Sequence, residues 1–236
     1  KRTLVVVGFG GDKVQAEIGA AAEFVLQAEQ LGTGHAMMHV QPVLAGFSGT
    51  ILLLCGDTPL LTGQALLDLV AAHQQSGAAA TVLTAMPADA TGYGRILRDE
   101  SGQVLGIVEQ KDATAEQKQI GEINTGIYCF EAAPLFAALA GLTCNNAQKE
   151  YYLTDVLAIL AQAGQPVGAV EVADFQETLG INSRLQLAEA EKILRQRKLV
   201  ELMDSGVTVM DPASTFVDAS VSVGEDTVLY PFTWLE

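Results

Sequence analysis

Short apolar runs alternate along the chain with stretches in which apolar residues recur at helical spacing. The runs that predict strands lie at 3–8, 24–26, 51–54, 80–85, 124–130 and 166–172. Thr62 is suited to a helix N-cap, and apolar positions follow it at i, i+3, i+4 and i+7, which predicts a helix; a helix is likewise expected from Asp12. The apolar face of the helix after Thr62 holds Leu66, Leu69, Val70 and His73, and that of a later expected helix holds Leu153, Val156, Leu157 and Leu160. This βαβ rhythm predicts an α/β fold with a largely parallel sheet and helices on both faces.

One segment departs from that rhythm. Residues 94–110, "GRILRDESGQVLGIVEQ", contain two apolar stretches on either side of the polar turn 99–102. This arrangement is typical of an antiparallel hairpin. We therefore expect a hairpin inserted into the predicted sheet.

The stretch 51–61, "ILLLCGDTPLL", places a carboxylate directly after an apolar run. The run is bounded by Gly56 and Pro59, which predicts a strand buried on both faces. Asp57 follows it, and an ionised carboxylate at such a place is costly unless it is paired. Two interpretations remain open from the residues alone. Asp57 is either a turn or helix-cap residue, or a ligand for a cation at the carboxyl end of a strand.

The C-terminal part begins with a well-signalled helix. Ser183 and Gln186 form an S-x-x-Q capping box, worth about 1 kcal/mol at a helix start. Asn182 therefore stands just before a helix N-terminus, where its oxygen could join Asp57 in holding a hard cation such as magnesium.

The tail after this helix changes character. Four aliphatic residues recur every six positions: Val217, Val223, Leu229 and Leu235. A period of six predicts the first coils of a parallel β-helix, and chance alignment is the alternative.

Composition and charge narrow the function classes. The 236 residues are 49% hydrophobic, enough for a packed core in one large or two small domains. The net charge of −15 argues against nucleic acid and against an anionic membrane surface. An anionic substrate would need local basic groups or a metal ion. The three cysteines lie at no metal-like spacing, which favours reduced, mostly buried thiols in a cytoplasmic protein.

Three short motifs carry weaker signals. "VVVGFGGDK" lacks the third glycine of a dinucleotide-binding loop, because Lys13 stands there. His35 and His39 are spaced as in helical zinc sites, but Ala36 replaces the glutamate that such a motif needs. In "AEQLGTGHA" (28–36) free backbone N–H groups at a helix start could meet an acceptor, although a simple turn has the same sequence.

Seven ordered motifs, covering essentially the whole chain, carry a family resemblance. They are "VLQAEQLGTGHAM", "LLLCGDTPLL", "TGYGRI", "GIVEQKDAT", "INTGIY", "NNAQKEYYLTD" and "GINSRLQLA". Together they resemble the bacterial bifunctional N-acetylglucosamine-1-phosphate uridylyltransferases/glucosamine-1-phosphate acetyltransferases. The resemblance implies a Rossmann-like uridylyltransferase domain at 1–182, a linking helix at 183–206, and the start of a left-handed β-helix acetyltransferase domain at 207–236.

The resemblance also implies an activity and its partners. The activity is the magnesium-dependent formation of UDP-N-acetylglucosamine and pyrophosphate from UTP and N-acetylglucosamine-1-phosphate, in cytoplasmic synthesis of peptidoglycan and lipopolysaccharide precursors. Full-length members of the family form homotrimers. Nucleic acid and membrane are not among the expected partners.

Site roles follow residue by residue from the matched motifs. Gln27, Gly32 and Thr33 match positions that hold uracil, and Gly94, Glu109 and Asn124 match positions that bind the N-acetylglucosamine moiety. Asp57 and Asn182 match the magnesium ligands, so Asp57 would take part in catalysis through the metal. Glu150 and Tyr151 match a loop near the sugar. Cys55 and Gly56 belong to the same substrate-binding stretch as Asp57. The family usually has Tyr where this chain has Cys55, so any contact of Cys55 with a ligand would be made through its backbone.

The ends of the chain depart from the family pattern. It starts "KRTLVVVG", without the family's Gly-rich loop and its Arg and Lys, and it stops before any acetyltransferase site. We therefore expect a fragment that by itself binds UDP-N-acetylglucosamine weakly at best and catalyses neither reaction. Two alternatives stay open: a nucleotidyltransferase for another sugar phosphate, and a non-catalytic domain that binds sugar nucleotides.

Overall fold

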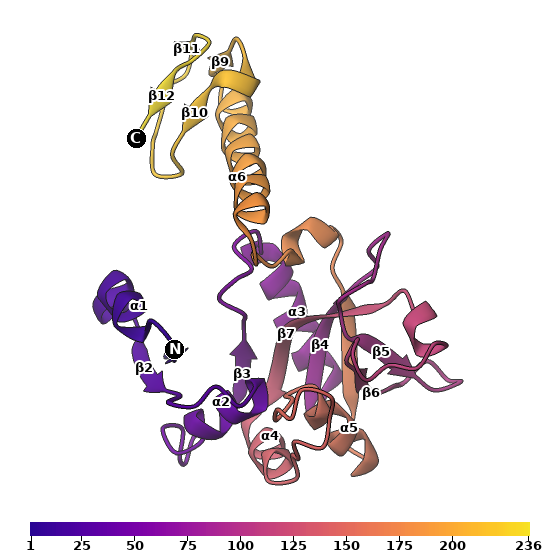
Figure 1. The fold of residues 1–236 in the computed structure, drawn as a ribbon. Helices are drawn as coiled ribbons and strands as arrows, with labels where there is room; N and C mark the ends of the chain where they lie inside the picture. The colour runs from indigo at the N-terminus through magenta and orange to yellow at the C-terminus, as the bar shows by residue number, and fades with distance from the viewer. The chain divides into compact units, whose positions relative to one another are not determined.

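The computed structural model describes residues 1–236, and they form two compact units (Figure 1). The first unit comprises residues 1–55 and 63–175, and the second comprises residues 56–62 and 176–236. Each unit has its own hydrophobic core.

A mixed sheet forms the centre of the first unit. Its strands are β3 (Thr50–Leu53), β4 (Ala80–Ala85), β5 (Arg95–Arg98), β6 (Val104–Val108), β7 (Ile123–Glu131) and β8 (Val167–Glu171). Their order is β6-β5-β7-β4-β8, and β3 pairs with β7 as well. The longest strand, β7, is antiparallel to β3, β4 and β5, and only β4 and β8 pair in parallel. The prediction of a largely parallel sheet is therefore wrong.

The segment between β4 and β7 explains this difference. It holds the predicted hairpin, β5 and β6, instead of the crossover helix that a parallel neighbour requires. The turn of the hairpin forms where the sequence predicts it. The Asp99 carboxylate accepts hydrogen bonds from the N–H groups of Ser101 and Gln103, both at 2.9 Å.

Strand β3 differs from its prediction in burial. It pairs with β7 alone, and Leu52 is 37% exposed, so the strand is not buried on both faces. The apolar run continues beyond the strand, because Leu54 lies after its last residue and is also exposed.

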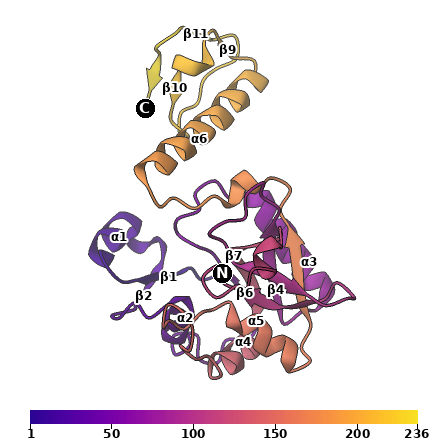
Figure 2. The same ribbon diagram turned by 45° about the vertical axis from the view of Figure 1, so that its right-hand side comes forward.

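Helices pack on both faces of the sheet, as predicted (Figure 2). The helices of this unit are α1 (Gly11–Ile18), α2 (Thr33–Val40), α3 (Gly63–Ser76), α4 (Ala132–Leu139) and α5 (Asp155–Gln162), with 3₁₀ turns η1 (Gly19–Ala21) and η2 (Gln117–Gln119). On β4, Thr81 points to α3, whereas the alternating residue Val82 belongs to the core that α4 and α5 help to form. The unit is thus an α/β structure built around a mixed sheet.

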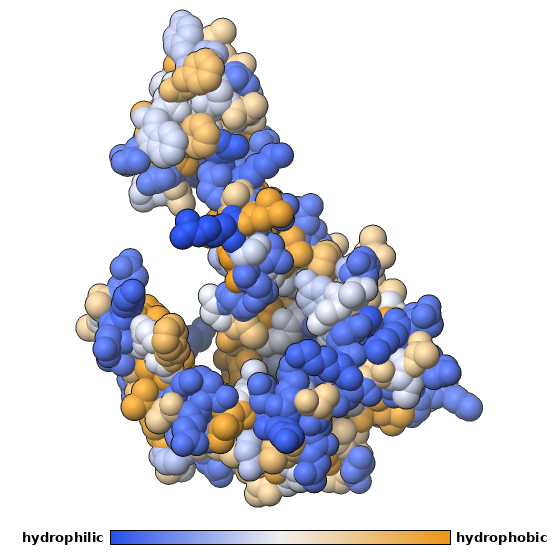
Figure 3. All heavy atoms as spheres, viewed as in Figure 1, coloured by the Kyte–Doolittle hydropathy of each residue, from blue (hydrophilic) through white to orange (hydrophobic).

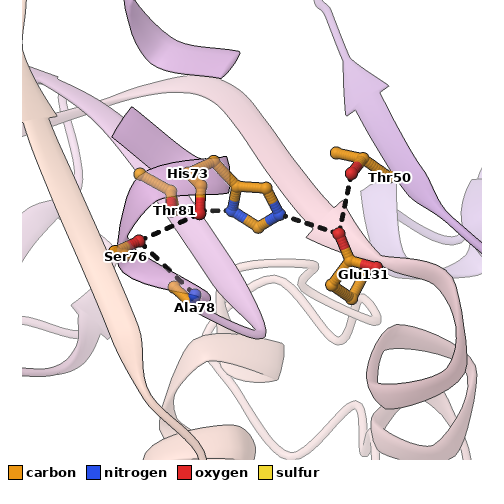
Figure 4. Close-up of polar contacts among 6 residues, drawn as sticks. All are labelled: Thr50, His73, Ser76, Ala78, Thr81 and Glu131. Atoms are coloured by element: carbon orange, nitrogen blue, oxygen red, sulfur yellow. Dashed lines mark hydrogen bonds and ion pairs between the residues drawn. The ribbon is translucent and has the colours of Figure 1, made fainter. Parts of the chain in front are cut away.

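A buried histidine fixes α3 to the sheet (Figure 4). The His73 ring is 1% exposed; its Nδ1 lies 2.8 Å from the Thr81 hydroxyl and its Nε2 lies 3.2 Å from the Glu131 carboxylate. Thr50 donates to the same carboxylate oxygen at 2.7 Å. The hydroxyl–imidazole–carboxylate order resembles a nucleophile with its base, but Thr81 is buried and cannot reach a substrate. The network is structural.

Strands β1 (Leu4–Val7) and β2 (Glu23–Leu26) form a separate parallel pair with α1 between them in sequence. Around this pair, apolar side chains remain on the surface: Phe9 is 99% exposed and Leu26 is 63% exposed. Hydrophobic atoms are visible in this region of the space-filling view (Figure 3).

The second unit is organised around a 21-residue helix, α6 (Arg184–Asp204). The Ser183 hydroxyl accepts from the Gln186 N–H at 3.2 Å, and the Gln186 side chain accepts from the Asn182 N–H at 2.7 Å. The predicted helix start is confirmed. The reciprocal bond goes to the N–H of Asn182 instead of that of Ser183.

Four two-residue strands follow α6: β9 (Thr208–Val209), β10 (Phe216–Val217), β11 (Val228–Leu229) and β12 (Trp234–Leu235). Thr208 pairs with Val228, 20 residues on, and Phe216 with Trp234, 18 residues on, both in parallel. Val217 and Leu229 are buried in the core of this unit, and Val223 and Leu235 pack against it. The unit also contains η4 (Pro212–Ser214) and all of η3 (Phe175–Thr178) except its first residue, Phe175, which belongs to the first unit. No helix in either unit combines the length and apolar character needed to cross a membrane.

Candidate functional site

Three of the predicted sugar-binding residues come together at one end of the sheet. Gly94 precedes β5, Glu109 follows β6, and Asn124 lies on β7, and the N–H of Asn124 donates to the Gly94 carbonyl at 2.9 Å. A Cβ atom on Gly94 would lie 3.4 Å from the Glu109 carboxylate and 3.5 Å from the Asn124 Cβ. Residues 15 to 30 positions apart in sequence therefore form a single cluster, which we call the Glu109 cluster.

The side-chain amide of Asn124 is held through its oxygen, and its nitrogen makes no hydrogen bond within the protein. Its Oδ1 accepts from the Gly126 N–H at 3.0 Å and from the Tyr128 hydroxyl at 2.9 Å. Because both acceptor positions of the carbonyl are used, the Nδ2 group is the part of Asn124 that remains to bind a ligand. Burial raises the pKa of Tyr128, so its hydroxyl stays protonated and keeps donating to Asn124.

Glu109 is a partly buried carboxylate. Burial raises its pKa above the ordinary value, the hydrogen bond from Thr154 opposes this rise, and the nearby carboxylates of Asp155 and Asp112 add to it. The Thr154 hydroxyl donates to Oε1 at 3.2 Å. Glu109 thus offers an acceptor beside the donor of Asn124.

Cys55 lies next to this cluster. Its Sγ donates to the Gly126 carbonyl at 3.3 Å, and a Cβ on Gly126 would lie 2.9 Å from that sulfur. Gly126 has a φ of 80°, a conformation that glycine adopts freely. The sulfur therefore supports the turn that holds Asn124.

The three predicted base-binding residues form a second cluster, at the start of α2. The Gln27 Nε2 donates to the Gly32 carbonyl at 3.1 Å, and Thr33 is the first residue of the helix. Gly32 has a φ of 107°, and a Cβ there would lie 2.7 Å from the Tyr151 carbonyl oxygen. The N–H groups of Gly32 and Thr33 have no hydrogen-bond acceptor in the protein. We call this group the Gln27 cluster.

Residues 150–154 join the two clusters. The Gly34 N–H donates to the Tyr151 carbonyl at 2.7 Å, and the Leu153 N–H donates to the Thr33 hydroxyl at 3.1 Å. One residue further on, Thr154 donates to Glu109. Glu150 also lies close to Gly32: a Cβ added to that glycine would be 2.9 Å from the Glu150 Cβ. The sequence pattern gave no signal for Thr154, because an isolated threonine in "YYLTD" has no distinctive spacing.

The second unit contains Gly56, Asp57 and Asn182. The Ile181 N–H donates to the Asp57 carbonyl at 2.8 Å. A Cβ on Gly180 would lie 3.4 Å from the Asp57 carboxylate and 3.7 Å from the Asn182 Nδ2. The two residues that the sequence predicts as partners therefore flank the same glycine. Gly56 precedes Asp57 in an exposed turn.

The donor chemistry of this pair suits a hard cation. The Asp57 carboxylate accepts no hydrogen bond from the protein and caps no helix; only its backbone carbonyl is engaged. One carboxylate and one amide can offer oxygen ligands, and magnesium bound to few protein groups keeps several waters. No cluster of three or more His, Cys, Asp or Glu side chains suited to a metal occurs in the structure. The residues fit a hydrated magnesium ion better than a metal enclosed by protein ligands.

Comparison with known proteins gives a family and several close relatives. The family model described as nucleotidyl transferase matches residues 11–197. The bifunctional protein GlmU of Pelotomaculum thermopropionicum is 56% identical over 233 residues, which is 99% of this chain and 51% of that protein. The protein of the same name from Geobacillus thermodenitrificans is 49% identical over 100% of this chain and 51% of its own length. The one from Syntrophotalea carbinolica is 54% identical over 97% of this chain and 49% of its own length. The chain spans about half the length of the curated relatives it matches.

Proposed function

This chain belongs to the nucleotidyl transferase family, and we propose that it carries the site at which UTP and N-acetylglucosamine-1-phosphate form UDP-N-acetylglucosamine and pyrophosphate. In this reaction a phosphate oxygen of the sugar phosphate bonds to the α-phosphorus of UTP. The bond from that phosphorus to the oxygen that leaves with pyrophosphate breaks. The substrates are those implied by the seven motifs, and the relatives named GlmU support the same assignment.

The Glu109 cluster carries this proposal. An N-acetyl group has one N–H donor and one carbonyl acceptor. Asn124 has a free Nδ2 donor, because its Oδ1 is occupied, and Glu109 provides a partly buried acceptor. The pair is chemically complementary to an acetamido group, and Gly94 leaves room for it because a side chain there would meet both residues. A hydroxyl in place of the acetamido group would present its donor and its acceptor on a single oxygen instead of on a separate N–H and C=O, so it would match the two partners less well.

The Gln27 cluster fits the uracil ring. The Gln27 Oε1 has no partner in the protein, and the Gly32 N–H lies at the start of a helix with no acceptor. An acceptor beside a donor matches the N3–H and an adjacent carbonyl of uracil. Residues 150–154 touch both clusters, so the base and the sugar of one nucleotide would be bound by residues whose positions depend on each other.

We propose that Asp57 and Asn182 hold magnesium. A bound magnesium ion would neutralise negative charge on the phosphoryl oxygens, which a chain of net charge −15 does little to attract by itself. The residues of the chain would position the two substrates, since alignment and charge stabilisation supply most of the catalysis in phosphoryl transfer. We further propose a cytoplasmic location and a role in precursor synthesis, and that 207–236 begins a β-helix. The parallel pairing at 18 residues, or three six-residue steps, supports that last point.

A thermal-shift panel tests the assignment. With magnesium present, UDP-N-acetylglucosamine should raise the melting temperature more than UDP-glucose, ADP-glucose or GDP-mannose. A larger shift with another sugar nucleotide would favour a nucleotidyltransferase for a different sugar phosphate. Pyrophosphate release from UTP and N-acetylglucosamine-1-phosphate, measured on this chain and on one extended upstream, separates an enzyme from a domain that only binds.

A further inference from the structure

We infer that His35 is a positioning residue for base selection: it fixes the side-chain amide of Gln27 so that the carbonyl Oε1 is the atom offered to the base. The inference rests on the proposed function, in which Gln27 contacts uracil. No motif assigned a role to His35, whose spacing from His39 suggested only a metal pair that the sequence does not complete.

Two hydrogen bonds determine which way the Gln27 amide points. Its Nε2 lies 3.1 Å from the Gly32 carbonyl oxygen and 3.1 Å from the His35 Nδ1. A backbone carbonyl can only accept, so the amide group facing it must be the NH₂ and cannot be the oxygen. The second amide hydrogen then points at His35. The Nδ1 of that ring must accept it, which places the ring proton on Nε2.

The consequence appears on the other side of the amide. With both N–H bonds used, Gln27 can present only its Oε1 to a ligand, and this oxygen has no partner in the protein. Gln27 is 9% exposed, so the amide has little room to rotate. Uracil has a hydrogen-bond donor at N3, whereas cytosine has an acceptor there. An Oε1 held in place therefore accepts from uracil and repels cytosine.

Neighbouring rings hold His35 in the required orientation. Tyr151 stacks on it with ring centroids 6.1 Å apart, and His39 packs edge-on at 4.6 Å. The backbone of Tyr151 is itself fixed against α2 by the Gly34 N–H. Residues 150–154 thus contact the Gln27 cluster through His35 as well as through Gly32.

The test compares the binding of UDP and CDP by isothermal titration calorimetry. We expect the wild-type chain to prefer UDP, and His35→Leu to lower this preference by about 10-fold, because one of the two anchors of the amide is lost. His35→Asn places an acceptor oxygen near the position of Nδ1 and should keep the preference. His39→Leu is the matched control, since His39 touches the same ring but forms no bond to Gln27.

Each outcome is decisive. A His35→Leu chain with the wild-type UDP to CDP ratio, or a His35→Asn chain that loses the preference as fully as His35→Leu does, overturns the inference. If His35→Leu does not fold, the ¹⁵N shifts of the wild-type His35 ring decide: a proton on Nε2 supports the inference, and a proton on Nδ1 overturns it. A wild-type chain that binds UDP and CDP equally overturns the proposed base site, whatever the tautomer of His35.

Discussion

The Thr154 hydroxyl donates a hydrogen bond to the Glu109 carboxylate at 3.2 Å, and this bond connects residues 150–154 to the end of β6. Removing the donor in Thr154→Val should raise the pKa of Glu109 further, because the bond stabilises the ionised form. A pH titration of the Glu109 side chain by NMR measures this. Thr154→Ser keeps the hydroxyl and should leave the pKa near its wild-type value; equal pKa values in all three proteins would contradict the role of the bond.

Glu109 should also leave a signature in the dependence of stability on pH. Its pKa is raised in the folded state, so the folded protein holds the proton more tightly than the unfolded chain. As the pH rises from about 4.3, the unfolded value, through the folded pKa, Glu109 therefore lowers the free energy of unfolding. Glu109→Gln removes this contribution, so as the pH rises over that range the melting temperature of the mutant should increase relative to that of the wild type. A mutant with the same pH profile as the wild type would show that burial does not perturb Glu109.

Gly32 is expected to tolerate no side chain. Its φ is 107°, and a Cβ would lie 2.7 Å from the Tyr151 carbonyl oxygen. Gly32→Ala should destabilise the protein by about 2–3 kcal/mol through the combined strain and clash. Gly46→Ala is the matched control, because Gly46 has a φ of 78° but nothing within 4 Å of its Cβ, so it should cost only about 1 kcal/mol. Denaturant unfolding measures both, and equal losses would mean that contact with Tyr151 is unimportant.

Asp57→Asn should remove the magnesium dependence of uridine nucleotide binding without unfolding the protein. The carboxylate makes no hydrogen bond within the protein, so the substitution breaks no contact of its side chain. Calorimetric titrations of UDP-N-acetylglucosamine with and without magnesium provide the measurement. Asp218→Asn, in the tail of the same unit, serves as the control. Unchanged magnesium dependence in Asp57→Asn would rule out its assignment as a ligand.

Local signals in the sequence predicted local structure well. The Ser183 and Gln186 cap and the Asp99 turn both form, because their hydrogen bonds lie within a few residues of each other. Strand direction was not predictable in this way, since a run of apolar residues has the same pattern whichever way it runs. Helix α4 was missed because "AAPLFAAL" has no polar residue to give it a helical period.

The site could be predicted only in part for a related reason. Gly94, Glu109 and Asn124 are far apart in sequence and have no shared period, so only the family resemblance grouped them. The structure places them together and adds Thr154 and Tyr128, whose roles depend on side-chain contacts that no spacing rule describes.

The most direct test of the account is whether binding depends on the acetamido group and on Asn124. Calorimetry should show that the wild-type chain binds UDP-N-acetylglucosamine more tightly than UDP-glucose. Asn124→Ala should weaken the binding of UDP-N-acetylglucosamine by about 1–3 kcal/mol, the typical cost of losing one buried hydrogen-bond partner, while leaving the binding of UTP unchanged. Equal affinity of the wild type for the two sugar nucleotides, or an equal loss for UTP and UDP-N-acetylglucosamine in Asn124→Ala, would contradict the proposed sugar site.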